Sequence, residues 1–166
     1  REGWALSLQM LINSYLVPGS PAVVFDYSEI RPAGAPIKTF GGSASGPAPL
    51  AELHQSVWGI LEARIGQKLT LTDIADLGNL IGVCVVAGNV RRSAELFMGP
   101  ATPEFLGLKD YSQESGMRRA SWSWMSNNSV ETNVSEDLDP IVPGIIANGE
   151  PGVIWMDTTR AYGRLV

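Results

Sequence analysis

The sequence predicts an α/β fold with parallel strands, and three observations support this prediction. After an opening helix, segments with a strand pattern and segments with a helical pattern follow in the order β-α-α-β-α-β. Helices between successive strands are typical of parallel pairing. With 166 residues, of which 45% are apolar and 17% charged, the chain can bury a core and lacks the composition of a disordered protein.

The first part of the chain is predicted to hold a helix, a strand and a long loop. Apolar residues at spacings of three and four predict the helix over residues 2–16, before a Pro-Gly pair. A run rich in valine and aromatic residues predicts the strand over 22–27. Residues 31–49 contain four glycines and four prolines. Because structureless loops of this length are uncommon in compact domains, we expect this one to be functional.

Two helices are predicted after this loop. Apolar spacing indicates the first over 50–66, and nearby prolines suit its first turn, where a missing N–H costs nothing. Thr70 and Asp73 have the spacing of a capping box and open the second helix, which continues to Val85.

The rest of the chain alternates between short extended and helical segments. An extended segment is predicted over 91–97, a short helical piece over 104–111 and a strand over 125–130. A helix shortened by its prolines follows over 137–148, and a final strand over 152–157.

Charge and residue content exclude several functions. The formal net charge of −5 argues against direct binding to nucleic acid or to an anionic membrane surface, and no apolar run is long enough to span a membrane. The single cysteine excludes a disulfide framework and a cysteine metal cage. The lone His54, expected to be exposed or half-buried, completes neither a metal set nor a catalytic triad. We therefore expect a cytoplasmic segment with no metal site and no catalytic residue of its own.

The glycine-rich loop is a candidate anion site. Arg31 and Lys38 supply positive charge, and Gly41, Gly42 and Ser43 lie shortly before a helix. Glycines let backbone N–H groups converge on a phosphate, whose charge the cationic side chains neutralise. The alternative is a loop that only turns the chain.

A second candidate site follows the third helix. Arginine pairs with phosphate or stacks on a base, and asparagine can read the edge of a base. The alternative is a helix C-cap with solvated arginines. The residues in question are Asn89, Val90, Arg91, Arg92 and Ser93.

Two further features are expected to be structural. Cys84 lies on the apolar face of the third helix, where a free cysteine behaves as a small buried hydrophobe. Arg118 and Arg119 are expected to stack on a packed surface with Trp122 and Trp124.

Long motifs in this sequence resemble the adenosylcobalamin-dependent (class II) ribonucleotide reductases, and most closely their monomeric ribonucleoside-triphosphate reductase type. Residues 25–47 and 84–95 carry the resemblance. It extends to residues 1–4, 126–130 and 148–152, and so covers most of the chain.

The resemblance implies a ten-stranded α/β barrel that converts ribonucleotides to deoxyribonucleotides for DNA replication. In that family adenosylcobalamin generates a thiyl radical on a cysteine, and a cysteine pair, renewed by a thioredoxin-like reductant, reduces the substrate. The family's Asn-Pro-Cys-Gly-Glu motif is absent from this sequence. The family likeness therefore predicts that residues 1–166 are a partial catalytic barrel domain, incomplete at both ends and inactive alone.

By the same resemblance, residues 31–49 and 88–95 are the two specificity loops. Arg31 and Lys38 would hold a deoxyribonucleoside triphosphate effector, with Gly41, Gly42 and Ser43 as supporting backbone. Asn89, Val90, Arg91, Arg92 and Ser93 would relay the effector's identity to the choice of ribonucleoside triphosphate substrate. Two alternatives stay open: a noncatalytic α/β module that binds nucleotides or anions, and an α/β domain whose loops are only structural.

Overall fold

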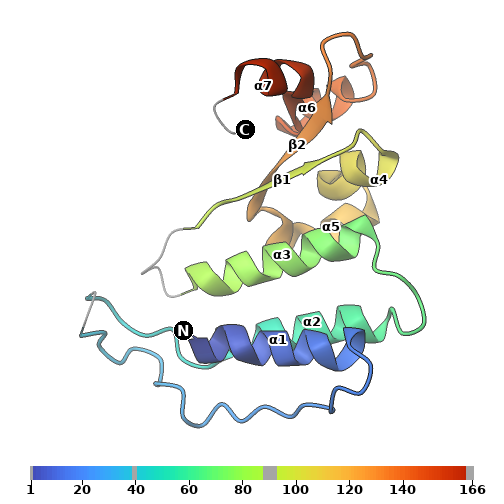
Figure 1. The fold of residues 1–166 in the computed structure, drawn as a ribbon. Helices are drawn as coiled ribbons and strands as arrows, with labels where there is room; N and C mark the ends of the chain where they lie inside the picture. Colours follow the sequence, from blue (N-terminus) through green and yellow to red (C-terminus); the bar gives the residue numbers. More distant parts are fainter. Residues whose placement is uncertain (1, 39–40, 88–92, 164–166) are drawn as a thin grey trace. The chain divides into compact units, whose positions relative to one another are not determined.

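The computed structural model describes residues 2–38, 41–87 and 93–163 (Figure 1). The chain forms two compact units. The helical unit comprises Arg1–Asp73 and Leu80–Ser93, and the sheet unit comprises Ile74–Asn79 and Ala94–Val166. One long helix therefore contributes residues to both units.

The helical unit is built on a pair of helices that pack against each other, α1 (Glu2–Leu16) and α2 (Ala48–Glu62) (Figure 1). Leu11 of α1 is buried, and Leu53 and Val57 lie on the buried face of α2. Burying such a side chain stabilises the fold by about 1.5–3 kcal/mol, and the three- and four-residue spacing aligns these side chains on one face. Both predicted helices are confirmed, and α2 ends four residues earlier than predicted.

The third helix, α3 (Leu71–Val86), begins at the predicted capping box. Thr70 Oγ1 accepts a hydrogen bond from the Asp73 backbone N–H at 3.1 Å, and Asp73 Oδ2 accepts one from the Thr70 N–H at 2.7 Å. Arg64 Nε also donates to Asp73 Oδ2, at 2.6 Å. Burial of Asp73 disfavours its charge, but the bonds from Arg64 and Thr70 outweigh burial and lower the pKa of the carboxyl.

Residues 22–27 are extended, but the predicted strand is wrong. The segment has the expected alternation, with Phe25 and Tyr27 partly buried and Val24 97% exposed. No described strand pairs with it, so its backbone joins no ladder. The aromatic side chains pack on α2 instead, which accounts for the apolar pattern without a sheet.

The glycine-rich loop folds back on itself before α2 begins. Pro36 and Ser43 form an antiparallel bridge, and the Gly34 N–H donates to the Ala44 carbonyl at 2.9 Å. Gly46, with φ of +79°, lies where a Cβ atom would be 3.0 Å from Ala33. Only glycine fits this close approach without displacing its neighbour.

The sheet unit contains a parallel sheet of three strands in the order β1 (Glu95–Gly99), β2 (Ser126–Thr132) and β3 (Gly152–Trp155). Glu95 pairs with Ser126, and Ser129 pairs with Gly152. The predicted α/β class and parallel pairing are confirmed. The described residues hold this one small sheet, and the ten-stranded barrel is not seen in them.

Short helices form most of the connections between these strands, and one more follows the last strand. They are α4 (Pro103–Leu106), the 3-10 turn η1 (Gly107–Lys109), α5 (Glu114–Ser123), α6 (Val142–Asn148) and α7 (Met156–Tyr162). The short piece at α4 and the proline-shortened α6 were predicted. Helices α5 and α7 were not predicted, and the predicted final strand runs two residues into α7.

The missed helix α5 buries an unusual face. Its buried residues are Gly116, Arg119 and Ser123, which give no apolar stripe to detect. A Cβ atom at Gly116 would collide with the carbonyl oxygen of Asp110. The helix is therefore placed by close backbone packing and by polar contacts.

Candidate functional site

A cavity of about 900 Å³ lies in the helical unit beside the glycine-rich loop. We call it the Arg31 cavity. Three helices supply its apolar lining, with Trp4 and Leu8 from α1, Leu50 and Leu53 from α2, and Ile81 and Val85 from α3. Cavities of several hundred cubic ångströms with mainly apolar walls are typical of small-molecule sites.

The polar groups of the Arg31 cavity come from the loop segment. Glu29, Arg31, Ser43 and Ser45 line it, and Arg31 is exposed. Within the described residues, Arg31 has no hydrogen-bond or ion-pair partner. A guanidinium with all its donors available, next to serine hydroxyls, is suited to binding a phosphate.

The segment leading to Arg31 is fixed by His54. The His54 ring stacks on Phe25 with ring centroids 4.0 Å apart, and its Nδ1 lies 2.9 Å from the Tyr27 hydroxyl. Its Nε2 lies 3.0 Å from Ser7 Oγ on α1. Tyr27 precedes Arg31 by only four residues, so this network anchors the base of the loop.

His54 is only 4% exposed, so the expectation of an exposed or half-buried histidine is wrong. The reason is tertiary: α1 and the extended segment at Phe25 both cover that position of α2. Burial lowers the pKa of the imidazole, which favours its neutral form. Hydroxyl partners on both nitrogens suit a neutral ring, because one nitrogen donates and the other accepts.

Cys84, on α3, is buried as predicted and lines the same cavity. Burial and then the negative charge of Glu52 raise the pKa of the thiol to about 11. A thiol with this pKa is almost entirely protonated at neutral pH, and the thiolate is the form that acts as a nucleophile.

The structure separates the predicted anion-site residues into two groups. Arg31 and Ser43 line the cavity, whereas Lys38, Gly41 and Gly42 are outside its lining. Lys38 is exposed, and the glycines have φ values of +71° and +83° at the turn of the loop, where the Gly41 N–H donates to Ile37. Their glycine identity is explained by that turn.

The second predicted site is only partly described. Asn89, Val90, Arg91 and Arg92 lie outside the described residues. Ser93 is exposed and leads into β1.

Arg118 and Arg119 differ from the expectation that both stack on tryptophans. Arg118 pairs with Glu114 on the exposed side of α5. Arg119 is 8% exposed, and its Nε lies 2.7 and 2.9 Å from the two carboxylate oxygens of Asp76. Trp122 Nε1 donates to the same carboxylate at 2.7 Å. A buried charge requires such a partner, and Asp76 is too far away in sequence to have been foreseen.

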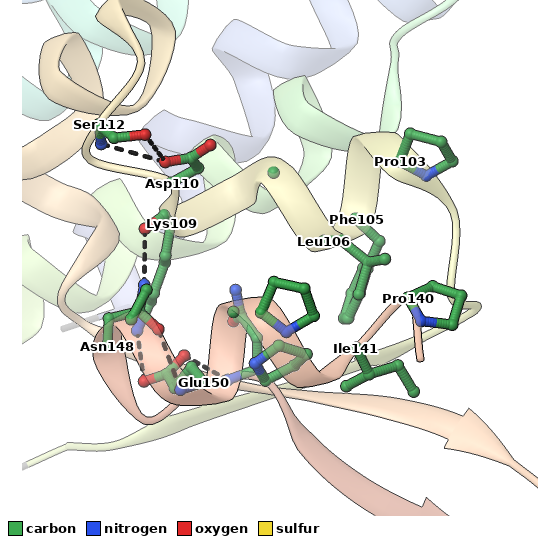
Figure 2. Close-up of a pocket in the computed structure, with 16 residues that line it drawn as sticks. Pro103, Phe105, Leu106, Lys109, Asp110, Ser112, Pro140, Ile141, Asn148 and Glu150 are labelled. Carbon is green, nitrogen blue, oxygen red and sulfur yellow. Dashed lines mark hydrogen bonds and ion pairs between the residues drawn. The ribbon is translucent and has the colours of Figure 1, made fainter. Parts of the chain in front are cut away.

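A second cavity, of about 420 Å³, lies in the sheet unit (Figure 2). Figure 2 shows Lys109 and Glu150 at one side of it, joined by an ion pair of 2.8 Å. Lys109 also donates to the Ser126 carbonyl, and Glu150 Oε2 accepts from the Asn128 N–H at 3.1 Å. Because these charged groups bind each other and the backbone, they are not available to a ligand.

The described residues form neither a metal-binding cluster nor a helix that could span a membrane. Residues 2–38, 41–87 and 93–163 contain no group of three His, Cys, Asp or Glu side chains placed to hold a metal ion. Among the helices of the same residues, none has the length and apolar character needed to cross a bilayer.

The chain is similar in sequence and in structure to one family of known proteins. A family model described as "B12-dependent ribonucleotide reductase, insertion domain" matches residues 1–61. A probable adenosylcobalamin-dependent ribonucleoside-triphosphate reductase of Dictyostelium discoideum is 46% identical over 100% of this chain. The corresponding reductase of Euglena gracilis is 45% identical over 99% of it. A crystal structure of a B12-dependent (class II) ribonucleotide reductase matches 99% of the chain with a TM-score of 0.82 and 37% identity. The chain belongs to the class II ribonucleotide reductases.

The match covers only part of each class II ribonucleotide reductase. The chain spans 22% of the length of the two curated relatives and 23% of the solved chain. The insertion-domain model ends within α2, so it includes α1 and the whole glycine-rich loop. The part of a class II ribonucleotide reductase that this chain represents therefore includes the Arg31 cavity with its loop.

Proposed function

We propose that this chain is a segment of an adenosylcobalamin-dependent ribonucleoside-triphosphate reductase. The parent would reduce ribonucleoside triphosphates by a thiyl-radical mechanism, and this segment of its barrel domain would supply the specificity loops 31–49 and 88–95. The names of the relatives support the reaction. The segment does not supply the reacting thiols, because its one cysteine is buried and has a raised pKa.

The Arg31 cavity is proposed to bind the allosteric effector, a deoxyribonucleoside triphosphate. The observation that carries this proposal is an arginine that has no partner in the described part of the chain and lies beside a cavity with apolar helical walls. Phosphates would bind Arg31 and the Ser43 hydroxyl, and the deoxynucleoside would occupy the apolar part. Lys38 would add a second positive charge from the same hairpin, whose turn Gly41 and Gly42 permit.

The second loop is proposed to choose the substrate base. Ile81 and Val85 of α3 line the cavity, and the sequence of the second loop, Asn89, Val90, Arg91, Arg92 and Ser93, follows shortly after the end of α3. An effector in contact with α3 is thus close in sequence to this loop. Coupling between two such sites typically amounts to about 1–3 kcal/mol, enough for a 5- to 150-fold change in affinity.

Among the described residues, His54 offers no ligand to the cobalt of adenosylcobalamin, because it is the chain's only imidazole, has both nitrogens in hydrogen bonds and is 4% exposed. We propose that the cofactor and the thioredoxin-like reductant bind parts of the parent outside this segment. A cytoplasmic location goes with the proposal, since a free cysteine is typical of reducing compartments.

The Arg31→Ala variant of the full-length reductase tests the effector assignment. Loss of the charge-assisted hydrogen bonds should raise the effector concentration needed for half-maximal stimulation about 10- to 100-fold, and should affect stimulation more than basal turnover. Turnover at increasing deoxyribonucleoside triphosphate concentration measures this. Arg118→Ala is the matched control, because Arg118 is exposed and paired with Glu114 outside the cavity.

An unchanged effector response in Arg31→Ala would contradict the assignment. Binding of deoxyribonucleotides by a full-length protein that shows no turnover would instead favour the noncatalytic nucleotide-binding module.

A further inference from the structure

The Arg31 cavity is polar on one side and apolar on the other. Charged and hydroxyl groups come from residues 29–45, whereas α1, α2 and α3 present mainly aliphatic side chains. Two helical residues of the lining are not aliphatic: Cys84, a buried thiol on α3, and Trp4, a half-buried indole on the first turn of α1. A nucleotide has the same division, with a charged phosphate end and a planar base at the other.

Trp4 and Trp155 differ from the other three tryptophans in their hydrogen bonding. The indole N–H groups of Trp58, Trp122 and Trp124 donate to Glu62, Asp76 and Ser121, respectively. The indoles of Trp4 and Trp155 have no hydrogen-bond partner among the described residues, and of these two only Trp4 lines the Arg31 cavity. The position of Trp4 is therefore not explained by a hydrogen bond to the described part of the chain.

We propose that Trp4 is the surface on which the base of the effector stacks, and that this contact serves all four bases alike. The inference rests on the proposed effector site and adds a residue from α1 to it. Stacking of a base on an aromatic ring is sequence-tolerant, because every base has a π face. The aliphatic neighbours Leu8, Leu53 and Ile81 offer no donors or acceptors that could distinguish base edges.

The backbone that carries Trp4 is held in place. Ser7 Oγ donates to the Trp4 carbonyl at 2.9 Å and lies 3.0 Å from His54 Nε2. With its one hydrogen donated to Trp4, the Ser7 hydroxyl accepts from Nε2, and Nδ1 then accepts from the Tyr27 hydroxyl at 2.9 Å. One neutral histidine therefore fixes both the Trp4 turn and the segment leading to Arg31. Because this part of the backbone is already ordered before the ligand binds, binding loses less conformational entropy there.

The test is to measure the dissociation constants of all four deoxyribonucleoside triphosphates with the full-length protein. Trp4→Ala should weaken each of them by about the same factor, near tenfold. Trp4→Phe keeps a ring and should restore most of the affinity. Trp58→Ala is the matched control, because Trp58 is 56% exposed on α2 and does not line the cavity, so its loss should change nothing.

Two further readouts separate stacking from a structural role of Trp4. Inorganic triphosphate has no base and should bind Trp4→Ala as it binds the wild type, which also shows that the site has folded. Addition of a deoxyribonucleoside triphosphate should quench tryptophan fluorescence in the wild type, and Trp4→Phe should lose that quenching.

The outcomes distinguish this inference from the proposed function. Unchanged affinities in Trp4→Ala, together with weakened binding in Arg31→Ala, would overturn the role of Trp4 and leave the effector site in place. Loss of affinity for a single base would overturn the claim that the contact serves all bases. Unchanged binding in both variants would overturn the effector site itself.

Discussion

Arg31 and Arg119 carry the same side chain in opposite surroundings. Arg31 lies exposed at a cavity with no partner among the described residues, whereas Arg119 is buried and paired with Asp76. The difference shows how to distinguish a ligand-binding arginine from a structural one. An arginine whose donors are already bound to protein stabilises the fold, and one whose donors remain available can bind a phosphate.

The same contrast extends to the two units. In the helical unit the buried polar group is neutral, because His54 bonds to hydroxyls and its pKa is lowered by burial. In the sheet unit the buried charged groups are paired, Asp76 with Arg119, and Lys109 with the half-buried Glu150. The buried cations of the sheet unit are thus bound by protein carboxylates, whereas Arg31 of the helical unit has no such partner among the described residues and is available to attract an anion.

The largest expected effect comes from breaking the buried pair. Arg119→Leu leaves the Asp76 carboxylate buried without its cation, which typically costs about 3–5 kcal/mol. The free energy of unfolding in urea measures this cost. Arg118→Ala is the control one residue away, and its exposed pair should contribute at most about 1 kcal/mol. Equal losses in the two variants would remove the distinction between structural and exposed arginines.

A smaller effect is expected where α3 meets β1 in the sheet unit. In Gly78→Ala the new Cβ would lie 2.6 Å from the Phe97 ring, and such overpacking typically costs about 1–3 kcal/mol. Gly59→Ala on α2 is the matched control, since nothing lies within 4 Å of its Cβ position. There, alanine's helix propensity should stabilise the protein by up to about 1 kcal/mol. Urea unfolding compares the two, and equal stability would show that Phe97 moves freely.

The smallest expected effect is a pH dependence due to His54. Its folded-state pKa is lowered by burial, so the unfolded chain binds the proton more readily. Stability is therefore full above the unfolded pKa of about 6.5 and falls as the pH drops below it. Binding of this one proton lowers the free energy of unfolding by at most about 0.7 kcal/mol between pH 7 and pH 6. His54→Phe should flatten this part of the profile, and an unchanged slope would assign the titration to another group.

Local signals in the sequence predicted most of the fold. The capping box at Thr70 and Asp73 marked the start of α3 because both of its hydrogen bonds form within one turn. The segment at residues 22–27 was misassigned because an alternating pattern reports burial on one side and not a partner strand. The burial of His54 and the helix α5 were not predicted, because both depend on residues far away in sequence. His54 is covered by Phe25, and Arg119 of α5 pairs with Asp76.

The candidate site was predictable only in its loop. Arg31 and Ser43 stood out because charge and glycine lie together in one segment, and both line the cavity. Trp4 and Ile81 also line it, but each belongs to a helical stripe that indicates a core face just as well. Which part of an apolar stripe is covered and which part faces a cavity depends on how the helices pack.

The buried thiol of Cys84 has a further consequence for the parent protein. With a pKa of about 11, only about 1 in 10,000 of these groups is a thiolate at pH 7. Thiol–disulfide exchange proceeds through the thiolate, so Cys84 takes almost no part in it. The reductase proposed above as the parent, with a cysteine pair that is renewed in every cycle, would therefore contain no competing thiol in this segment.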